Sequence, residues 1–146
     1  MRRRTFILVA TAAAATGFPA LAQEAARLNP NTATAEQMTR VPGVNATLAD
    51  AIVRQWPFAS IVEFNALVRQ TLSEAQATGV YETLFVPVNL NTGTNAQIAL
   101  IPGMTTRMIR EFLEYRPYRD LATFDREIGK YVNQAEVARL RSYITL

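Results

Sequence analysis

Apolar residues recur at helical spacing behind each of two Pro-Gly pairs. One run is Val44, Leu48, Ala49, Ile52, Val53 and Trp56, and the other is Met104, Met108, Ile109, Phe112 and Leu113. Spacings of three and four residues are typical of an amphipathic helix whose apolar face is buried. The pattern therefore predicts two core-facing helices. We expect the aromatic residues nearby to join the same core, namely Trp56, Phe58, Phe64, Tyr118 and Phe124.

Polar and turn-forming positions repeat too, at one constant offset along the chain and without a gap. The residues Asn29, Asn31, Thr32, Thr34, Gln37, Pro42, Gly43, Pro57 and Phe64 return as Asn89, Asn91, Thr92, Thr94, Gln97, Pro102, Gly103, Pro117 and Phe124. This repeat indicates a small supersecondary module that occurs twice. We assign it to residues 28–86, called unit one, and residues 88–146, called unit two. Its Asn-x-Asn-Thr segment can bond local backbone groups, and ligand binding is the alternative role.

Capping signatures mark where helices begin. A hydroxyl or amide side chain is followed three residues later by Gln or Glu, as in a capping box. Such pairs are Thr34 with Gln37, Thr94 with Gln97, Ser60 with Glu63, Ser73 with Gln76, and Asn133 with Glu136, while Asp120 can cap at the position equivalent to Ser60. The sequence thus predicts an all-α protein with four short helices in each unit.

The Pro-Gly pair of each unit predicts a hairpin between its first two helices. Gly43 and Gly103 supply the backbone freedom that a tight turn needs, and Asn45 and Thr105 can cap the helix that follows. A helix that begins at such a turn points free N–H groups outward, where they can bind a phosphate.

These hairpins resemble those of the helix-hairpin-helix proteins, in particular the exported ComEA-like DNA-binding proteins. The resemblance rests on residues 28–34 with Val41-Pro42-Gly43-Val44, and on residues 88–94 with Ile101-Pro102-Gly103-Met104. It implies tandem helix-hairpin-helix units in a compact, pseudo-duplicated helical protein. It also implies DNA binding without sequence preference, with hairpin amides on phosphates across the minor groove, as in a receptor for incoming DNA.

The chain departs from that family at the second glycine of the hairpin, which is replaced by Asn45 in unit one and Thr105 in unit two. A side chain at this position can hold the backbone away from a phosphate. Residues 69–72 and 129–132, where a second hairpin of each unit would lie, depart further from the pattern.

Charge favours the hairpin of unit two. Residues 29–86 hold three arginines and five acids, a formal charge of −2, whereas residues 89–146 hold seven arginines, one lysine and six acids, a charge of +2. The nucleic-acid-binding residues that we expect are Gly103, Met104, Thr105, Thr106, Arg107 and Arg110, together with Gly43, Val44 and Asn45 of unit one. The alternative for Arg107 and Arg110 is structural, because each lies four residues before a glutamate, a common surface pairing.

The start of the chain predicts a signal peptide over residues 1–22. A basic segment, Arg2 to Arg4, precedes an apolar run, and Ala20-Leu21-Ala22 has the form of a cleavage site. We therefore expect an exported protein, periplasmic or secreted. Residues 3–7 also resemble a twin-arginine signal, which would mean export after folding. A membrane anchor is the alternative, but the apolar run is short for about 30 Å of hydrocarbon. Without residues 1–22 the chain is formally neutral.

The absence of cysteine and histidine narrows the chemistry. It removes disulfides, thiolate metal sites and the commonest acid–base group, and no carboxylate pair stands out as a general acid and base. We expect no enzyme activity, no cofactor and no metal. The expected partner is the backbone of double-stranded DNA. The alternative is an envelope protein, bound by a periplasmic interaction module that keeps the fold without binding DNA.

Overall fold

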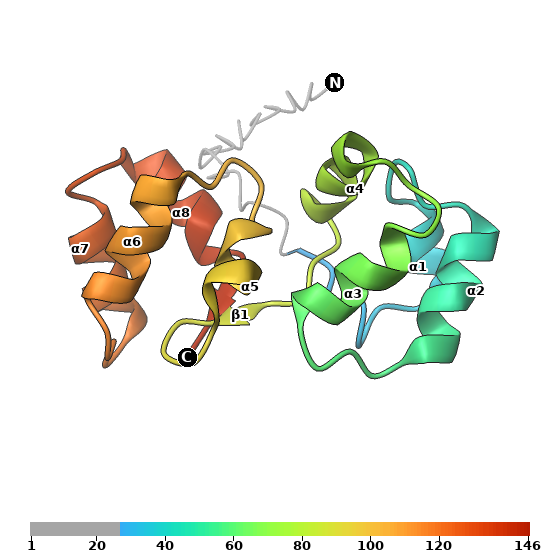
Figure 1. Ribbon diagram of the computed structural model, residues 1–146, viewed down its shortest axis with the longest axis horizontal. Coiled ribbons are helices and arrows are strands. Elements are labelled where there is room, and N and C mark those ends of the chain that lie inside the picture. Colours follow the sequence, from blue (N-terminus) through green and yellow to red (C-terminus); the bar gives the residue numbers. More distant parts are fainter. Residues whose placement is uncertain (1–26) are drawn as a thin grey trace, which may run out of the picture.

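The computed structural model describes residues 27–146 and is built almost wholly of short helices (Figure 1). Unit one contains α1 (Ala35–Thr39), α2 (Ala46–Gln55), α3 (Ile61–Val68) and α4 (Glu74–Tyr81). Unit two contains α5 (Asn95–Ala99), α6 (Thr106–Glu114), α7 (Leu121–Ile128) and α8 (Gln134–Arg141). The expected all-α class, with four helices in each unit, is confirmed. The expected signal peptide lies outside the described residues.

Each unit is closed by a short parallel pairing between its first and last residues. In unit two, β1 (Val88–Asn89) pairs with β2 (Ile144–Thr145), and in unit one a bridge joins Leu28 to Leu84. The two pairings fall at equivalent positions of the sequence repeat. The sequence analysis did not anticipate them, because a pairing of one or two residues leaves no periodic pattern. Among residues 27–146, no helix combines the length and apolar character needed to cross a bilayer.

Most of the expected caps are present. Thr34 with Gln37, Thr94 with Gln97 and Ser73 with Gln76 form complete capping boxes. Asp120 and Asn133 each accept a backbone N–H at the start of their helices.

The capping box expected at Ser60 is wrong. The Ser60 side chain makes no cap hydrogen bond, and the Glu63 carboxylate accepts instead from the backbone N–H of Ala59, at 2.8 Å. A carboxylate can therefore satisfy a free amide next to the helix start without the hydroxyl taking part.

The repeated Asn-x-Asn-Thr has a structural role in both units. The Asn31 side-chain amide donates to the Phe58 carbonyl at 2.9 Å, and its oxygen accepts from the Phe58 N–H at 2.8 Å. Asn91 makes the same two bonds to Tyr118, at 3.0 and 2.7 Å. One side chain thus satisfies both backbone groups of a residue 27 positions away. The segment clamps the approach to α1 or α5 against the start of the third helix.

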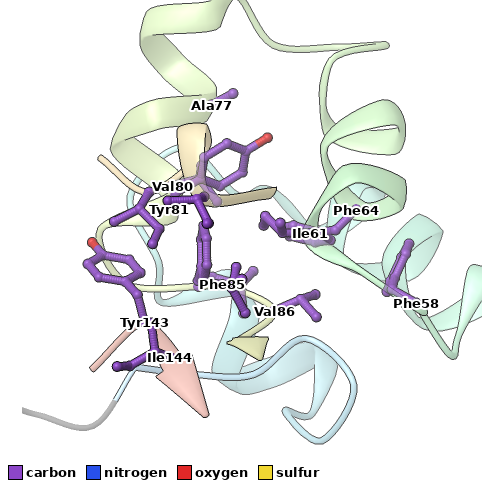
Figure 2. Packing of buried hydrophobic residues seen from close by; sticks show 14 of the residues in the cluster. Phe58, Ile61, Phe64, Ala77, Val80, Tyr81, Phe85, Val86, Tyr143 and Ile144 are labelled. Atoms are coloured by element: carbon purple, nitrogen blue, oxygen red, sulfur yellow. The ribbon is translucent and has the colours of Figure 1, made fainter. Parts of the chain in front are cut away.

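One buried core runs through both units. Within unit one, Phe58 packs on Phe64 with ring centroids 5.3 Å apart, and Phe64 packs on Tyr81 at 6.0 Å. Phe85 then bridges the units, with its ring 6.0 Å from Tyr81 and 4.8 Å from Tyr143 of unit two. Figure 2 shows these rings in succession. Because the packing is continuous across the junction, the two units share a core.

The two core-facing helices were predicted correctly except at the end of the first. Val53 and Trp56 are 37% and 40% exposed, so placing them in the core was wrong. Trp56 follows the last residue of α2, and its indole N–H donates to the carbonyl of Pro30. That hydrogen bond holds the ring against the surface rather than beneath it. The other expected core positions are buried or partly buried against the core.

Candidate nucleic-acid interface

The two Pro-Gly turns have the same backbone geometry. Gly43 has a φ of +90° and Gly103 a φ of +76°, a conformation that other residues adopt only with strain. Inside each turn the apolar residue after the glycine donates its N–H back three residues, Val44 to Val41 at 3.0 Å and Met104 to Ile101 at 3.1 Å. The amides of Val44 and Met104 are therefore used within the hairpins.

The helix that follows each turn is capped by the residue in place of the family's second glycine. Asn45 accepts from the Leu48 N–H at 2.8 Å, and Thr105 accepts from the Met108 N–H at 3.2 Å. Among the described residues, the amides of Gly103 and Thr105 donate to no protein acceptor. Both residues are exposed. The hairpin of unit two thus offers two free N–H groups at the positive end of the α6 dipole.

Cations and tyrosines from α6 and from the turn after α7 contact one another, in a group that we call the tyrosine cluster. It consists of Arg107, Tyr115, Lys130 and Tyr131. The Arg107 guanidinium lies 5.3 Å from the centre of the Tyr131 ring, and the Lys130 ammonium lies 5.3 Å from that of Tyr115. The two tyrosine hydroxyls are 2.8 Å apart. A cation over an aromatic face is held electrostatically. Tyr131 therefore positions Arg107 at the start of α6, and Tyr115, which follows the last residue of that helix, positions Lys130.

Tyr131 of the cluster stays protonated at neutral pH. Its shared hydrogen bond, together with one to Glu111, raises the pKa of Tyr131 above its usual value. Glu111 lies beneath the cluster and is only 5% exposed. A nearly buried carboxylate needs hydrogen-bond donors or a nearby cation, and Arg110 supplies the charge at 3.6 Å.

The alternative structural role of the two arginines of α6, pairing with the glutamate four residues on, is not what the structure shows. In the described part of the chain, Arg107 forms no ion pair with Glu111, and Arg110 none with Glu114. Arg110 instead reaches the adjacent Glu111 and keeps a side chain that is 70% exposed. Arg107 makes a ring contact rather than an ion pair. Both guanidinium groups therefore remain open to a phosphate.

Arg139 of α8 supports the hairpin from the inside. It donates to the Pro102 carbonyl at 2.8 Å and binds the Glu136 carboxylate through two nitrogens, at 2.6 and 2.7 Å. The Glu136 hydrogen bonds raise the pKa of Arg139, which stays charged. Sequence reasoning missed this role, because the equivalent residue of unit one is Gly79 and the repeat gave no hint of a partner there.

Lys130 and Tyr131 were also missed as parts of a site. They lie in residues 129–132, which depart from the family pattern, so the resemblance predicted no phosphate contact for them. Their basic and aromatic character was the available signal, since such residues often meet at nucleic-acid surfaces. The structure adds that the Tyr131 ring lies beside Arg107, and that Lys130 lies over Tyr115, the hydrogen-bond partner of Tyr131.

The hairpin of unit one has a different surface. A groove of about 170 Å³ runs between it and residues 70–72, with Thr47 and Ala51 in its walls. No cation lines this groove. The equivalent positions of unit two carry Arg107 and Glu111. Gly43, Val44 and Asn45 thus share the backbone of the second hairpin but not its charges.

Comparison with known proteins identifies the motif in unit one. Residues 23–69 match the family model of the helix-hairpin-helix motif. The match covers α1, the first hairpin, α2 and α3, and a motif of this kind suggests nucleic-acid binding in general. No curated protein and no solved structure matches the chain. The expected resemblance is confirmed as far as this motif, and the ComEA-like assignment stays a prediction.

Proposed function

We propose that the protein binds the backbone of double-stranded DNA without sequence preference, through the hairpin of unit two. The observation that carries the proposal is the coincidence of free amides and exposed cations at one helix start. Gly103 and Thr105 have unpaired N–H groups, and Arg107 and Arg110 project from the first turns of α6. Such groups match phosphate oxygens and carry no information about base identity.

Lys130 extends the same surface. It shares the Glu127 carboxylate with Arg126, so one acid faces two cations there. Arg107 has no acidic partner among the described residues. The local excess of positive charge is modest. Because the proposed binding is electrostatic, its affinity should fall as the salt concentration rises.

Unit one has a supporting part in this proposal. Its hairpin can offer backbone amides, but Asp50 lies where unit two has Arg110. We assign it the completion of the shared core and the orientation of its neighbour. We further propose that the chain is exported and loses residues 1–22 in the process, which N-terminal sequencing of the protein from its host tests, and that it serves DNA uptake.

The direct test is fluorescence anisotropy with a labelled duplex of random sequence, titrated from about 20 to 200 mM salt. Neutralising each phosphate releases counterions, so the logarithm of the association constant should fall with a log–log slope near −0.9 for each contact. We expect micromolar binding at low salt, a slope of about −2 or steeper, and equal affinity for unrelated sequences. Absence of binding at 20 mM salt by a folded, helical protein would contradict the proposal.

A second candidate function is supported by the surface of unit one. Three large apolar residues are more than one third exposed there: Val53, Trp56 and Val62. Exposed apolar residues can mark a protein contact, which suits an interaction module that has kept the fold without binding DNA. A Trp56→Ala variant separates the candidates, because it should leave duplex affinity unchanged while weakening capture of an envelope protein.

A further inference from the structure

A cleft of about 680 Å³ opens where the hairpin of unit two meets the end of α4. Its walls come from both units: Arg27 and residues 82–83, the hairpin residues 102–103, and α8 with Tyr143 behind it. None of the residues of the tyrosine cluster lines this cleft, and Gly103 is the residue that it shares with the proposed DNA surface. No role has so far been assigned to it.

Tyr143 brings an unsatisfied hydroxyl to this cleft. The residue has no exposed surface, and its ring packs edge-on against Phe85 at 4.8 Å. Figure 2 shows the hydroxyl pointing away from Phe85. Its oxygen has no hydrogen-bond partner among the described residues, which is uncommon for a buried polar group. Burial raises the pKa of this hydroxyl and outweighs the lowering effect of the neighbouring Arg27 and Arg139 guanidinium groups, so that the hydroxyl keeps its proton at neutral pH.

Arg27 brings a second unsatisfied donor. Its guanidinium carbon lies 3.5 Å from the centre of the Tyr143 ring, and one terminal nitrogen donates to the Ser142 hydroxyl. Its Nε is buried and has no partner in the described part of the chain. Arg27 also has no ion pair there, whereas the charge of Arg139 is already matched by Glu136. A cation without an ion pair in the described part of the chain and two free donors therefore meet at one cleft, whose walls also hold the unpaired Glu82 carboxylate.

Unsatisfied donors alone do not define a site. Arg116 Nε and the Tyr118 hydroxyl are also buried without partners, but neither residue lines this cleft. What distinguishes Arg27 and Tyr143 is the open volume beside them and Gly103, with its free amide, among the other residues that line it. The Arg116–Tyr118 pair thus offers a natural control within the same chain.

We propose that this cleft binds a phosphate group, held by the Tyr143 hydroxyl, the Arg27 guanidinium and the Gly103 amide. A phosphate has only acceptor oxygens when fully ionised, and so it suits three donors, of which the Arg27 guanidinium is charged. Because the Tyr143 hydroxyl is buried, only a small group that protrudes from its parent molecule can approach it. A free phosphate ion and the terminal phosphate of a nucleic-acid strand both have this shape.

The test is a titration of the protein with inorganic phosphate, against chloride at equal ionic strength. We expect saturable shifts of the Gly103 amide in NMR spectra and, at ten times Kd, a rise in Tm of roughly 4–7 °C. Tyr143→Phe removes only the unpartnered oxygen, so it should fold normally yet bind phosphate at least tenfold more weakly. Tyr118→Phe is the matched control and should bind as the parent does. A Tyr143→Phe variant with unchanged affinity, or no saturable effect at all, would overturn the proposal.

Glu82 gives a second test, because its carboxylate is the acid in the cleft walls that lacks an ion-pair partner there. Replacing it in Glu82→Gln should tighten phosphate binding severalfold, and unchanged or weaker binding would argue against an anion at this place.

Competition with duplexes that end in a 5′-phosphate or a 5′-hydroxyl distinguishes a strand end from a free phosphate ion as the ligand. Stronger competition by the phosphorylated duplex would identify a strand end as the ligand, and equal competition would identify a free phosphate.

Discussion

Units one and two have nearly the same backbone and very different surfaces. Equivalent positions of the repeat hold the same clamp at Asn31 and Asn91, and the same left-handed glycine at Gly43 and Gly103. The positions around the hairpin diverge, however: Thr47 corresponds to Arg107, and Thr71 to Tyr131. Residues that set the path of the chain have stayed alike, whereas residues that meet solvent beside the turn have changed.

The inner support of the two hairpins differs in the same way. In unit one a Cβ on Gly43 would lie 3.3 Å from a methyl carbon of Val80, so the turn rests on an apolar side chain. In unit two the turn rests on Arg139, which takes the place of Gly79 and bonds the Pro102 carbonyl. One fold thus supports an apolar hairpin and a charged one. The helix-hairpin-helix motif is recognised in unit one, although the cations that the proposed function needs lie in unit two.

The largest effect should come from breaking the packing that joins the units. Phe85→Ala removes the ring between Tyr81 and Tyr143 at a position that is 1% exposed. We expect a loss of about 3–5 kcal/mol in the free energy of unfolding, because a large cavity opens in a shared core. Urea denaturation measures it, and both units should lose stability in one transition. Val62→Ala, at an exposed position, should cost less than about 0.5 kcal/mol. Two separate transitions in the parent protein would contradict a shared core.

The clamps allow the likeness of the units to be tested directly. Asn31→Ala and Asn91→Ala each remove two hydrogen bonds and leave the backbone groups of Phe58 or Tyr118 unsatisfied. Each should therefore lower the free energy of unfolding by about 2 kcal/mol, and by similar amounts in the two units. Thermal or urea unfolding checks this. If one substitution were harmless, the clamp would have a structural role in only one unit.

The sequence predicted the shared frame well because that frame depends on local rules. Thr34 and Thr94 cap as expected, and the turns need glycine at the expected places, since both features are set within a few residues. The errors occurred where distant residues decide the outcome. Trp56 continues the apolar pattern of α2, but it follows the last residue of that helix and its indole N–H donates to the Pro30 carbonyl.

The candidate site was predicted less completely for the same reason. Arg107 and Arg110 could be named because they directly follow the hairpin. From the turn after α7, Tyr131 contacts Arg107 and Lys130 contacts Tyr115, and a linear pattern contains no sign of these contacts. The pairing partners of α6 were likewise unpredictable, because Glu111 is buried and its ion pair is with Arg110 rather than Arg107.

Removing the two arginines of α6 should leave the hairpin of unit two without cations from that helix, as the hairpin of unit one is. Arg107→Ala and Arg110→Ala together should weaken duplex binding equally for all sequences, and flatten the log–log salt dependence by roughly one to two units. Arg54→Ala on α2 is the control and should change neither quantity. Anisotropy titrations at several salt concentrations measure both. An unchanged slope in the double variant would exclude these arginines from phosphate contact.

The smallest effect concerns the residue that replaces the second hairpin glycine. Thr105 caps α6 through its hydroxyl, but glycine is also tolerated at a helix start, so Thr105→Gly should cost only a few tenths of a kcal/mol in stability. If the side chain holds a phosphate away from the free amides of Gly103 and Thr105, this variant should bind duplex DNA severalfold more tightly. Asn45→Gly makes the same change in the hairpin without cations, and should leave affinity nearly unchanged. Equal gains in both variants would show that the backbone alone determines binding, and that the charges of unit two contribute little. No gain in either would mean that the side chain does not limit the approach of a phosphate.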